Sequence, residues 1–167
     1  MATSNTGVPP HLREFPGVFV RDGDGRVVDA PQADQEVAMG YPAWSTKGAL
    51  KNGRRLTIMT AASRYAVGDE VRVIHVVETL STKDELYVMG PKSVLGEYVD
   101  GSLRTAEPAK GQDPLGPPMI YDGPVLSGPA VDYNYEITSY RFLSPETHKI
   151  VWKLGELRSN QLVIEVE

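Results

Sequence analysis

The side chains best suited to acid–base chemistry near neutral pH are three histidines, His11, His75 and His148, each isolated in the sequence. Glu78 follows His75 at a separation that, on a strand, sends the two side chains to opposite faces. We therefore interpret His75 as a buried or half-buried histidine on an apolar face, and His148 as a surface residue. The alternative is an enzyme whose site is assembled from distant residues, and it requires a polar pocket that contains His75 or His148.

Local sequence motifs indicate no catalytic or metal centre. The run Asp22-Gly23-Asp24-Gly25 could supply calcium ligands, but an EF-hand loop needs a glutamate at its twelfth position, where this chain has Ala33. A tight turn that uses the positive φ of glycine is the better interpretation. The chain has no cysteine, no nucleophile elbow, no phosphate-binding loop and no dinucleotide fingerprint. We therefore predict no catalytic residues, no metal and no cofactor, and we favour a protein without enzymatic activity.

Aromatic residues are the best candidates for a binding surface. Trp44 lies in a turn-rich segment, where an exposed ring would suit a carbohydrate or protein contact and a buried ring would cover one end of the core. The candidate binding residues are Tyr41, Trp44, Met119, Tyr121, Asp122, Tyr133 and Tyr135.

Two of these tyrosines belong to a predicted strand over residues 133–137. Tyr133 and Tyr135 share one face of this strand, whereas Tyr140 falls on the other if the strand continues. Either a bulge near residues 138–139 restores the register, or some tyrosines face outward and form an aromatic contact surface.

Charge and length narrow the class of partner. The 167-residue chain has 22 acidic and 17 basic side chains, a net charge of −5, whereas nucleic-acid binding needs a basic face. The densest basic cluster, residues 51–55, is short and is best explained as a hairpin turn built on Asn52-Gly53. The N-terminus resembles no secretory signal, and no apolar stretch approaches the roughly 20 residues of a membrane span. We therefore expect a cytoplasmic protein that binds neither nucleic acid nor a membrane.

Alternation of apolar and polar residues predicts strands over most of the chain. Residues 71–80 have apolar side chains on both faces, which predicts a central strand covered on both sides. Residues 86–89 predict a strand that pairs back on the central one, and residues 150–154 and 162–166 predict an antiparallel pair. Residues 33–39 favour a short helix.

Two segments of the chain differ from the rest in composition. Residues 1–16 are polar and predict a flexible arm with Leu12 and Phe15 as anchors. Residues 107–130 are so rich in proline and glycine that we expect no regular element there, but an irregular, partly packed excursion. A linker between two domains is the alternative. Because the strand pattern does not change across the excursion, we predict a single domain over residues 17–167.

Residues 147–166 resemble the closing hairpin of immunoglobulin-like sandwich modules. Trp152 lies on one strand, and the run Ser159-Asn160-Gln161-Leu162-Val163-Ile164-Glu165-Val166 forms the other. The resemblance implies an antiparallel β-sandwich, and some bacterial and intracellular modules of this kind bind or inhibit other proteins through end loops. The chain departs from the antibody pattern because it lacks the cysteine pair and its tryptophan comes late.

The predicted fold is therefore all-β, an immunoglobulin-like antiparallel β-sandwich with little helix and a long Pro/Gly-rich excursion. The predicted function is binding of another macromolecule, as inhibitor, adaptor or assembly subunit, through residues 107–130 and the segment around Tyr41 and Trp44. The alternative is a module for a carbohydrate or small molecule, which requires the aromatic candidates to converge in one open groove. Self-association through exposed strand edges is a further possibility.

Overall fold

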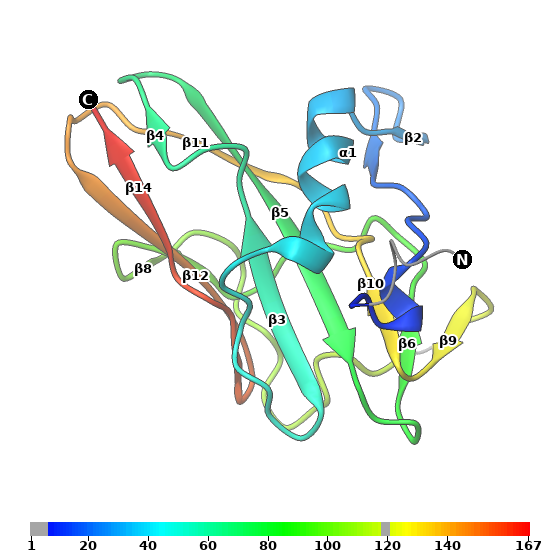
Figure 1. Ribbon diagram of the computed structural model, residues 1–167. Helices are drawn as coiled ribbons and strands as arrows, with labels where there is room; N and C mark the ends of the chain where they lie inside the picture. The colour runs from blue at the N-terminus through cyan, green and yellow to red at the C-terminus, as the bar shows by residue number, and fades with distance from the viewer. Residues whose placement is uncertain (1–6, 118–120) are drawn as a thin grey trace.

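The computed structural model describes residues 7–117 and 121–167 and consists mainly of β-strands (Figure 1). Its strands are β1 (Phe19–Arg21), β2 (Val27–Asp29), β3 (Arg54–Met59), β4 (Arg64–Tyr65), β5 (Glu70–Thr79), β6 (Glu85–Tyr87), β7 (Glu97–Val99), β8 (Ser102–Leu103), β9 (Val125–Ser127), β10 (Ala130–Asp132), β11 (Thr138–Arg141), β12 (Thr147–Leu154), β13 (Leu157–Arg158) and β14 (Leu162–Val166). The helical segments are α1 (Gln32–Met39) and the 3₁₀ turns η1 (Pro10–Leu12) and η2 (Tyr41–Ala43). The prediction of an all-β chain with little helix is confirmed. Within the described ranges, no helix combines the length and the apolar character needed to cross a membrane.

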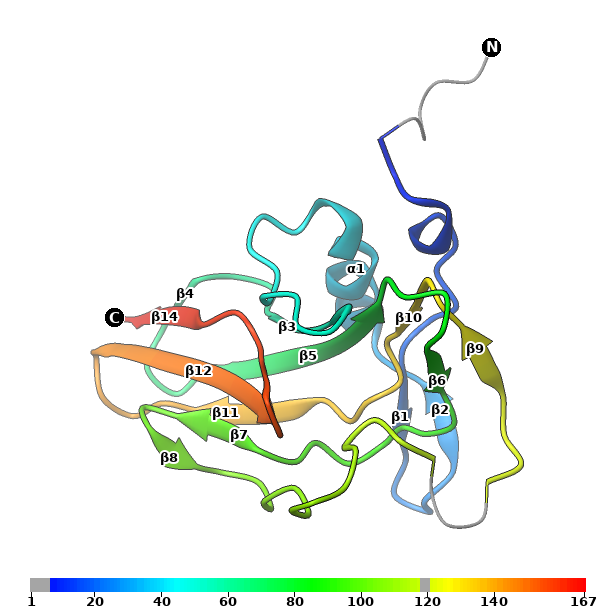
Figure 2. The same ribbon diagram turned by 90° about the horizontal axis from the view of Figure 1, so that it is seen from below.

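Two larger sheets make up most of the fold (Figure 2). In the first, β3, β10 and β11 all pair antiparallel with the long strand β5. In the second, the strand order is β4-β14-β12-β7-β8, with β13 added to β12. The predicted C-terminal pair is confirmed, because β12 and β14 are antiparallel with Ile150 opposite Leu162.

Strand β5 is the centre of the fold because both of its faces are buried. Val73 and Val77 belong to a core cluster that also contains Trp152 of the second sheet. Ile74 and Val76, on the opposite face, belong to a second cluster beneath α1 and the N-terminal residues. β-branched side chains on both faces suit such a position. The prediction of a central strand covered on both sides is confirmed.

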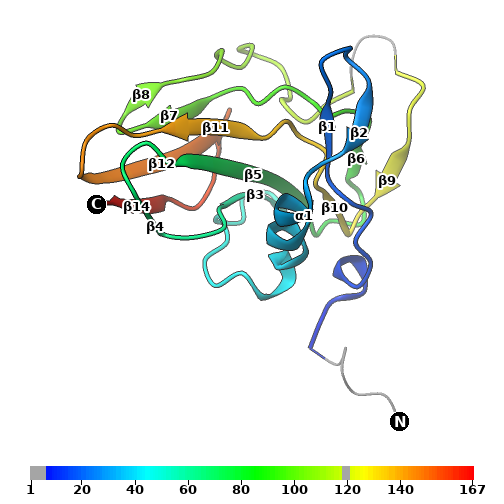
Figure 3. The ribbon, with the colours of Figure 1, turned by 90° about the horizontal axis from the view of Figure 1, so that it is seen from above.

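Two short ribbons, β1–β2 and β6–β9, lie at the end of the molecule away from the C-terminus (Figures 1 and 3). The second ribbon corrects two predictions. β6 does not pair back on β5 but pairs with β9, with Leu86 opposite Leu126, and β9 is a regular element within residues 107–130. The physical reason is that β3 already occupies one edge of β5 and β10 with β11 the other, so that β6 must pair elsewhere.

The predicted strand over residues 133–137 is also wrong, since this segment is a break between two strands. β10 ends before it and β11 begins after it, and the two pair with opposite ends of β5. The Tyr135 N–H donates to the Tyr133 carbonyl at 3.0 Å, which closes a tight turn. The turn sends Tyr133 to the second core cluster and Tyr135 to the first. The change of register that we ascribed to a bulge near residues 138–139 therefore occurs at this turn.

Local turn chemistry follows the sequence closely. Asn52 and Gly53 adopt φ angles of 55° and 77°, and together they form the predicted hairpin turn that leads into β3. In the β1–β2 turn, the Asp22 carboxylate accepts hydrogen bonds from the backbone N–H groups of Asp24 and Arg26 at 2.8 and 2.9 Å. The side chain that could have bound calcium therefore closes its own turn.

Candidate binding site

An apolar groove crosses the end of the molecule where the N-terminal residues meet the β6–β9 ribbon. It consists of two adjoining hollows of about 350 and 250 Å³, which share Pro16, Leu126 and Val131. Segments that are far apart in the chain contribute its main apolar side chains, which are Phe15, Phe19, Val88, Leu126, Pro129 and Val131. A concave, mostly apolar surface of this kind is typical of a binding site.

The groove is bordered by an exposed strand. Strand β9 pairs with β6 on one side, and within the described residues no strand pairs with its other side. Val125 and Leu126 of this strand are 44% and 40% exposed, although both are large and apolar. Exposed apolar side chains beside an unpaired strand edge are characteristic of interaction surfaces.

A second concavity, here named the aromatic hollow, adjoins the groove at Asp132, which lines both. It encloses about 320 Å³, and its wall includes Arg21, Tyr87, Lys92, Leu115, Tyr121 and Tyr135. The rings of Tyr87 and Tyr121 meet edge to face at 5.3 Å. The wall is thus built from the β1–β2 ribbon, from β6 and from the excursion.

One ion pair supports the floor of the aromatic hollow. The Lys92 ammonium donates to Asp132 at 2.8 Å and to the Asn134 carbonyl at 3.2 Å, and it lies 4.5 Å from the centre of the Tyr135 ring. Burial raises the pKa of Asp132 and outweighs the opposing effect of Lys92. Burial likewise raises the pKa of the Tyr135 hydroxyl well above its usual value. Lys92 thus links Asp132, Asn134 and Tyr135 on one side of the aromatic hollow.

The structure brings together only some of the predicted binding residues. Tyr121 and Tyr135 line the aromatic hollow, and Asp122 is exposed beside Tyr121. Tyr133 lines the groove but is only 3% exposed, and its ring packs at 5.2 Å against Phe15. Met119 lies outside the described residues.

Tyr41 and Trp44 pack into the protein and do not form the predicted contact surface. Tyr41 is completely buried, and its hydroxyl donates to Glu78 at 2.5 Å. Trp44 is half-buried and packs against both core clusters, which is the alternative role considered for it. The segment between α1 and β3 therefore covers the core, because its aromatic rings have apolar neighbours on the protein side.

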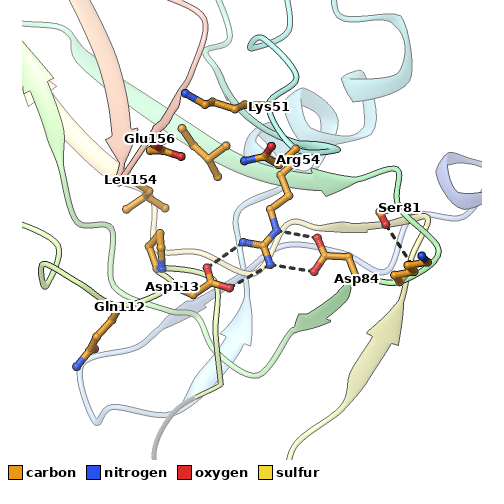
Figure 4. Close-up of a pocket in the computed structure, with 13 residues that line it drawn as sticks. Lys51, Arg54, Ser81, Asp84, Gln112, Asp113, Leu154 and Glu156 are labelled. Carbon is orange, nitrogen blue, oxygen red and sulfur yellow. Dashed lines mark hydrogen bonds and ion pairs between the residues drawn. The ribbon is translucent and has the colours of Figure 1, made fainter.

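A polar hollow of about 480 Å³ shares only Pro114 with the aromatic hollow (Figure 4). Its central group is Arg54, which binds two carboxylates in bidentate fashion. The guanidinium donates to Asp84 at 2.7 and 2.9 Å and to Asp113 at 2.9 and 3.1 Å. The hydrogen bonds from Arg54 lower the pKa of Asp84 to about 2 and also lower that of Asp113.

These contacts show how the excursion is held. Asp113 also accepts a hydrogen bond from the backbone N–H of Leu115 at 3.0 Å, and Leu115 is buried in the first core cluster. Arg54 therefore has its charge neutralised by the protein itself, and its role is to fasten residues 112–116 to the sheet. The prediction of a partly packed excursion holds for this segment.

Comparisons of the chain with models of protein families, with curated proteins and with solved structures gave no match. The site must therefore be interpreted from its own geometry.

His75 and His148 line neither the groove nor the hollows described above, whereas His11 lines the groove. His75 is 1% exposed, bonds through Nε2 to the buried Glu97 and packs edge to face on Trp152 at 4.9 Å. Burial alone would raise the pKa of Glu97, but His75 and the hydroxyl groups of Thr138 and Tyr140 outweigh it and lower this pKa. We interpret this cluster as a buried polar part of the core, in which Nδ1 of His75 has no hydrogen-bond partner among the described residues.

His148 is buried as well, which corrects its prediction as a surface residue. Its side chain is 8% exposed, stacks on Phe142 at 4.0 Å, and bonds through Nδ1 to Asp100 at 2.6 Å. Burial acts to lower the pKa of His148, but the hydrogen bonds with Asp100 and with the Ser144 carbonyl and the charges of Asp100 and Glu146 together outweigh it and raise this pKa. Among the described residues, no group of three or more histidine, aspartate or glutamate side chains is placed to hold a metal ion.

A buried carboxylate joins the N-terminal residues to the sheet. Glu78 accepts hydrogen bonds from Tyr41 and from Arg55, at 2.5 and 2.8 Å, and its other oxygen lies 2.5 Å from Nε2 of His11. Burial alone would raise the pKa of Glu78, but these three partners outweigh it and lower the pKa. Together with the buried Leu12, this contact holds residues 10–12 beside the groove.

Sequence reasoning missed Arg21, Lys92 and Leu115 as parts of a site. None of them lies in a motif, and each comes from a different segment. The proline-rich composition of residues 107–130 was the available signal, and it pointed to the excursion that supplies Leu115, Tyr121 and Leu126 to the two concavities.

Proposed function

We propose that this protein is a non-enzymatic binding module that holds an extended, apolar segment of another protein in the apolar groove. The observation that carries the proposal is the joining of two apolar hollows into one groove beside the exposed edge of β9. A partner strand could hydrogen-bond to this edge while its alternate side chains enter the groove. The excursion thus acts as a contact element through Leu126 and Pro129.

The architecture supports this proposal. We infer that the two larger sheets form a sandwich of the immunoglobulin-like kind, because residues of both sheets share the cluster around Trp152. In such modules the connections at one end of the sandwich are free to vary and to bind. The net charge of −5 favours a protein partner over nucleic acid.

A charge placed in the groove tests the proposal. A library of linear peptides displayed on phage is panned against the wild-type protein, and the enriched peptides are measured by calorimetry against Leu126→Lys and Val163→Lys. Leu126 and Val163 are 40% and 44% exposed, and Val163 lies on β14, outside the groove. The second variant is therefore a matched control for the added lysine.

We expect enriched peptides with apolar residues at alternate positions. Leu126→Lys should weaken their binding at least about tenfold, since a desolvated ammonium costs more than the apolar contact it replaces. Val163→Lys should bind like the wild type. Absence of enriched peptides, or equal affinities for all three proteins, would refute the proposal, provided that circular dichroism shows each variant folded.

A further inference from the structure

We propose that the aromatic hollow is a separate site for small ligands that combine a planar apolar ring with a carboxylate. This inference does not depend on the groove, because the aromatic hollow has its own wall and shares only Asp132 with it. The argument starts from two polar groups in the wall that the described part of the chain leaves with few or no hydrogen-bond partners.

Tyr135 is the first such group. The residue is 7% exposed, yet its hydroxyl makes no hydrogen bond within residues 7–117 and 121–167. Its ring is held between Lys92 and Trp152, at 4.5 and 5.2 Å respectively. This hydroxyl keeps contact with solvent in the hollow, so an acceptor on a bound ligand can replace water as its partner.

Arg21 is the second. Its guanidinium donates a single hydrogen bond within the described residues, to the Gly25 carbonyl at 3.3 Å, and forms no ion pair there. Lys92, in contrast, is already neutralised by Asp132 at 2.8 Å. The uncompensated charge in the wall is therefore positive, and a guanidinium binds a carboxylate through two parallel hydrogen bonds.

The remaining wall suits a ring. Tyr87 and Tyr121 meet edge to face, and the Tyr121 hydroxyl is fixed by the N–H of Met89 at 3.2 Å and by the Pro124 carbonyl. Leu86 and Leu115 are 2% and 6% exposed and supply apolar contact. A volume of about 320 Å³ lies at the lower end of the range for small-molecule pockets, which suits roughly one or two rings.

The test uses 3-phenylpropionate as the probe and 3-phenylpropionamide as its neutral counterpart. Binding is measured by calorimetry and by shifts in amide NMR spectra. We expect shifts near Tyr121 and Tyr135 with the carboxylate and about tenfold weaker binding of the amide, because the amide carries no charge for Arg21. No shift with up to millimolar carboxylate, or equal affinity for the two probes, would overturn the proposal.

Two pairs of variants locate the site. Arg21→Gln should weaken carboxylate binding about tenfold, whereas Arg26→Gln, an exposed arginine on the same ribbon, should leave it unchanged. Tyr135→Phe should weaken binding without loss of stability, because the hydroxyl it removes has no partner. Tyr140→Phe should leave ligand binding unchanged but lower the stability, since the Tyr140 hydroxyl donates to Glu97 at 2.5 Å. Wild-type affinity in both Arg21→Gln and Tyr135→Phe would overturn the assignment, and neither result bears on the peptide groove.

Discussion

Replacement of Glu78 by glutamine should destabilise the protein, because its carboxylate is the centre of a buried polar cluster. One oxygen accepts hydrogen bonds from Tyr41 and Arg55, and the other contacts His11. The Glu78 side chain is 1% exposed, so water cannot replace these partners in the folded protein. Glutamine keeps the shape but removes the charge and turns one acceptor into a donor.

The expected loss follows from the burial of each partner. Removal of one member of a fully buried ion pair costs about 3–5 kcal/mol. The Arg55 side chain is 21% exposed and can regain part of its hydration, and the glutamine oxygen can still accept one hydrogen bond. We therefore expect Glu78→Gln to lower the free energy of unfolding by about 2–3 kcal/mol at pH 7.

Urea unfolding at several pH values measures this effect and its pH dependence. The pKa of Glu78 in the folded protein lies below its ordinary value of 4.5, so its contribution to stability is complete above pH 4.5 and is lost as the pH falls through the folded pKa. The difference in stability between wild type and Glu78→Gln should therefore narrow from pH 5 to pH 3. Glu136→Gln, at an exposed position, is the control and should show little difference at any pH.

A double-mutant cycle with Tyr41→Phe completes the test. Tyr41→Phe should cost about 1.5–3 kcal/mol in the wild type and clearly less in Glu78→Gln, since the hydrogen bond to a charged acceptor is already lost. Two results would refute the reasoning. One is a stability difference between wild type and Glu78→Gln that stays the same at pH 3 and pH 7, and the other is additivity of the two substitutions.

Two further predictions concern other parts of the fold. Gly48→Ala should lower the free energy of unfolding by about 3 kcal/mol or more, because the added Cβ would lie 1.8 Å from the Leu56 carbonyl oxygen. Gly23→Ala is the control and should cost far less, because no atom lies within 4 Å of its added Cβ. Similar urea midpoints for the two variants would contradict this prediction. NMR titration of His148 should give a pKa above 6.5, and Asp100→Asn should lower that pKa. Asparagine is chosen because it tolerates the left-handed backbone of position 100, where φ is 51°. The His148 contribution to stability is accordingly present below pH 6.5 and is lost as the pH rises through the folded pKa; a pKa unchanged by Asp100→Asn would contradict the assigned cause.

Much of the fold could be predicted because its signals are local or lie within one strand. The alternation of residues 71–80 identified β5, and Asn52-Gly53 identified a hairpin turn. The partner of β6 could not be predicted, since it depends on which edges of β5 other strands already occupy. The break at residues 133–137 could not be predicted either, because Tyr133 and Tyr135 alternate with polar residues as in a strand.

The candidate sites show the same division. The sequence indicated that Tyr121, Tyr133 and Tyr135 were of interest, yet it also suggested Tyr41, which is fully buried. Arg21 and Lys92 carried no local signal, because their importance comes from neighbours that are distant in the chain.

By itself, the sequence determined the all-β class, the positions of most strands, the tight turns and the acidic net charge. These features depend on side-chain alternation, backbone preference and composition, which act within a few residues. Only the tertiary structure decided which strand edges pair, which tyrosines are buried and which residues line the groove and the aromatic hollow. The physical reason is that burial and concavity arise from segments packed across the fold, so each depends on the whole chain at once.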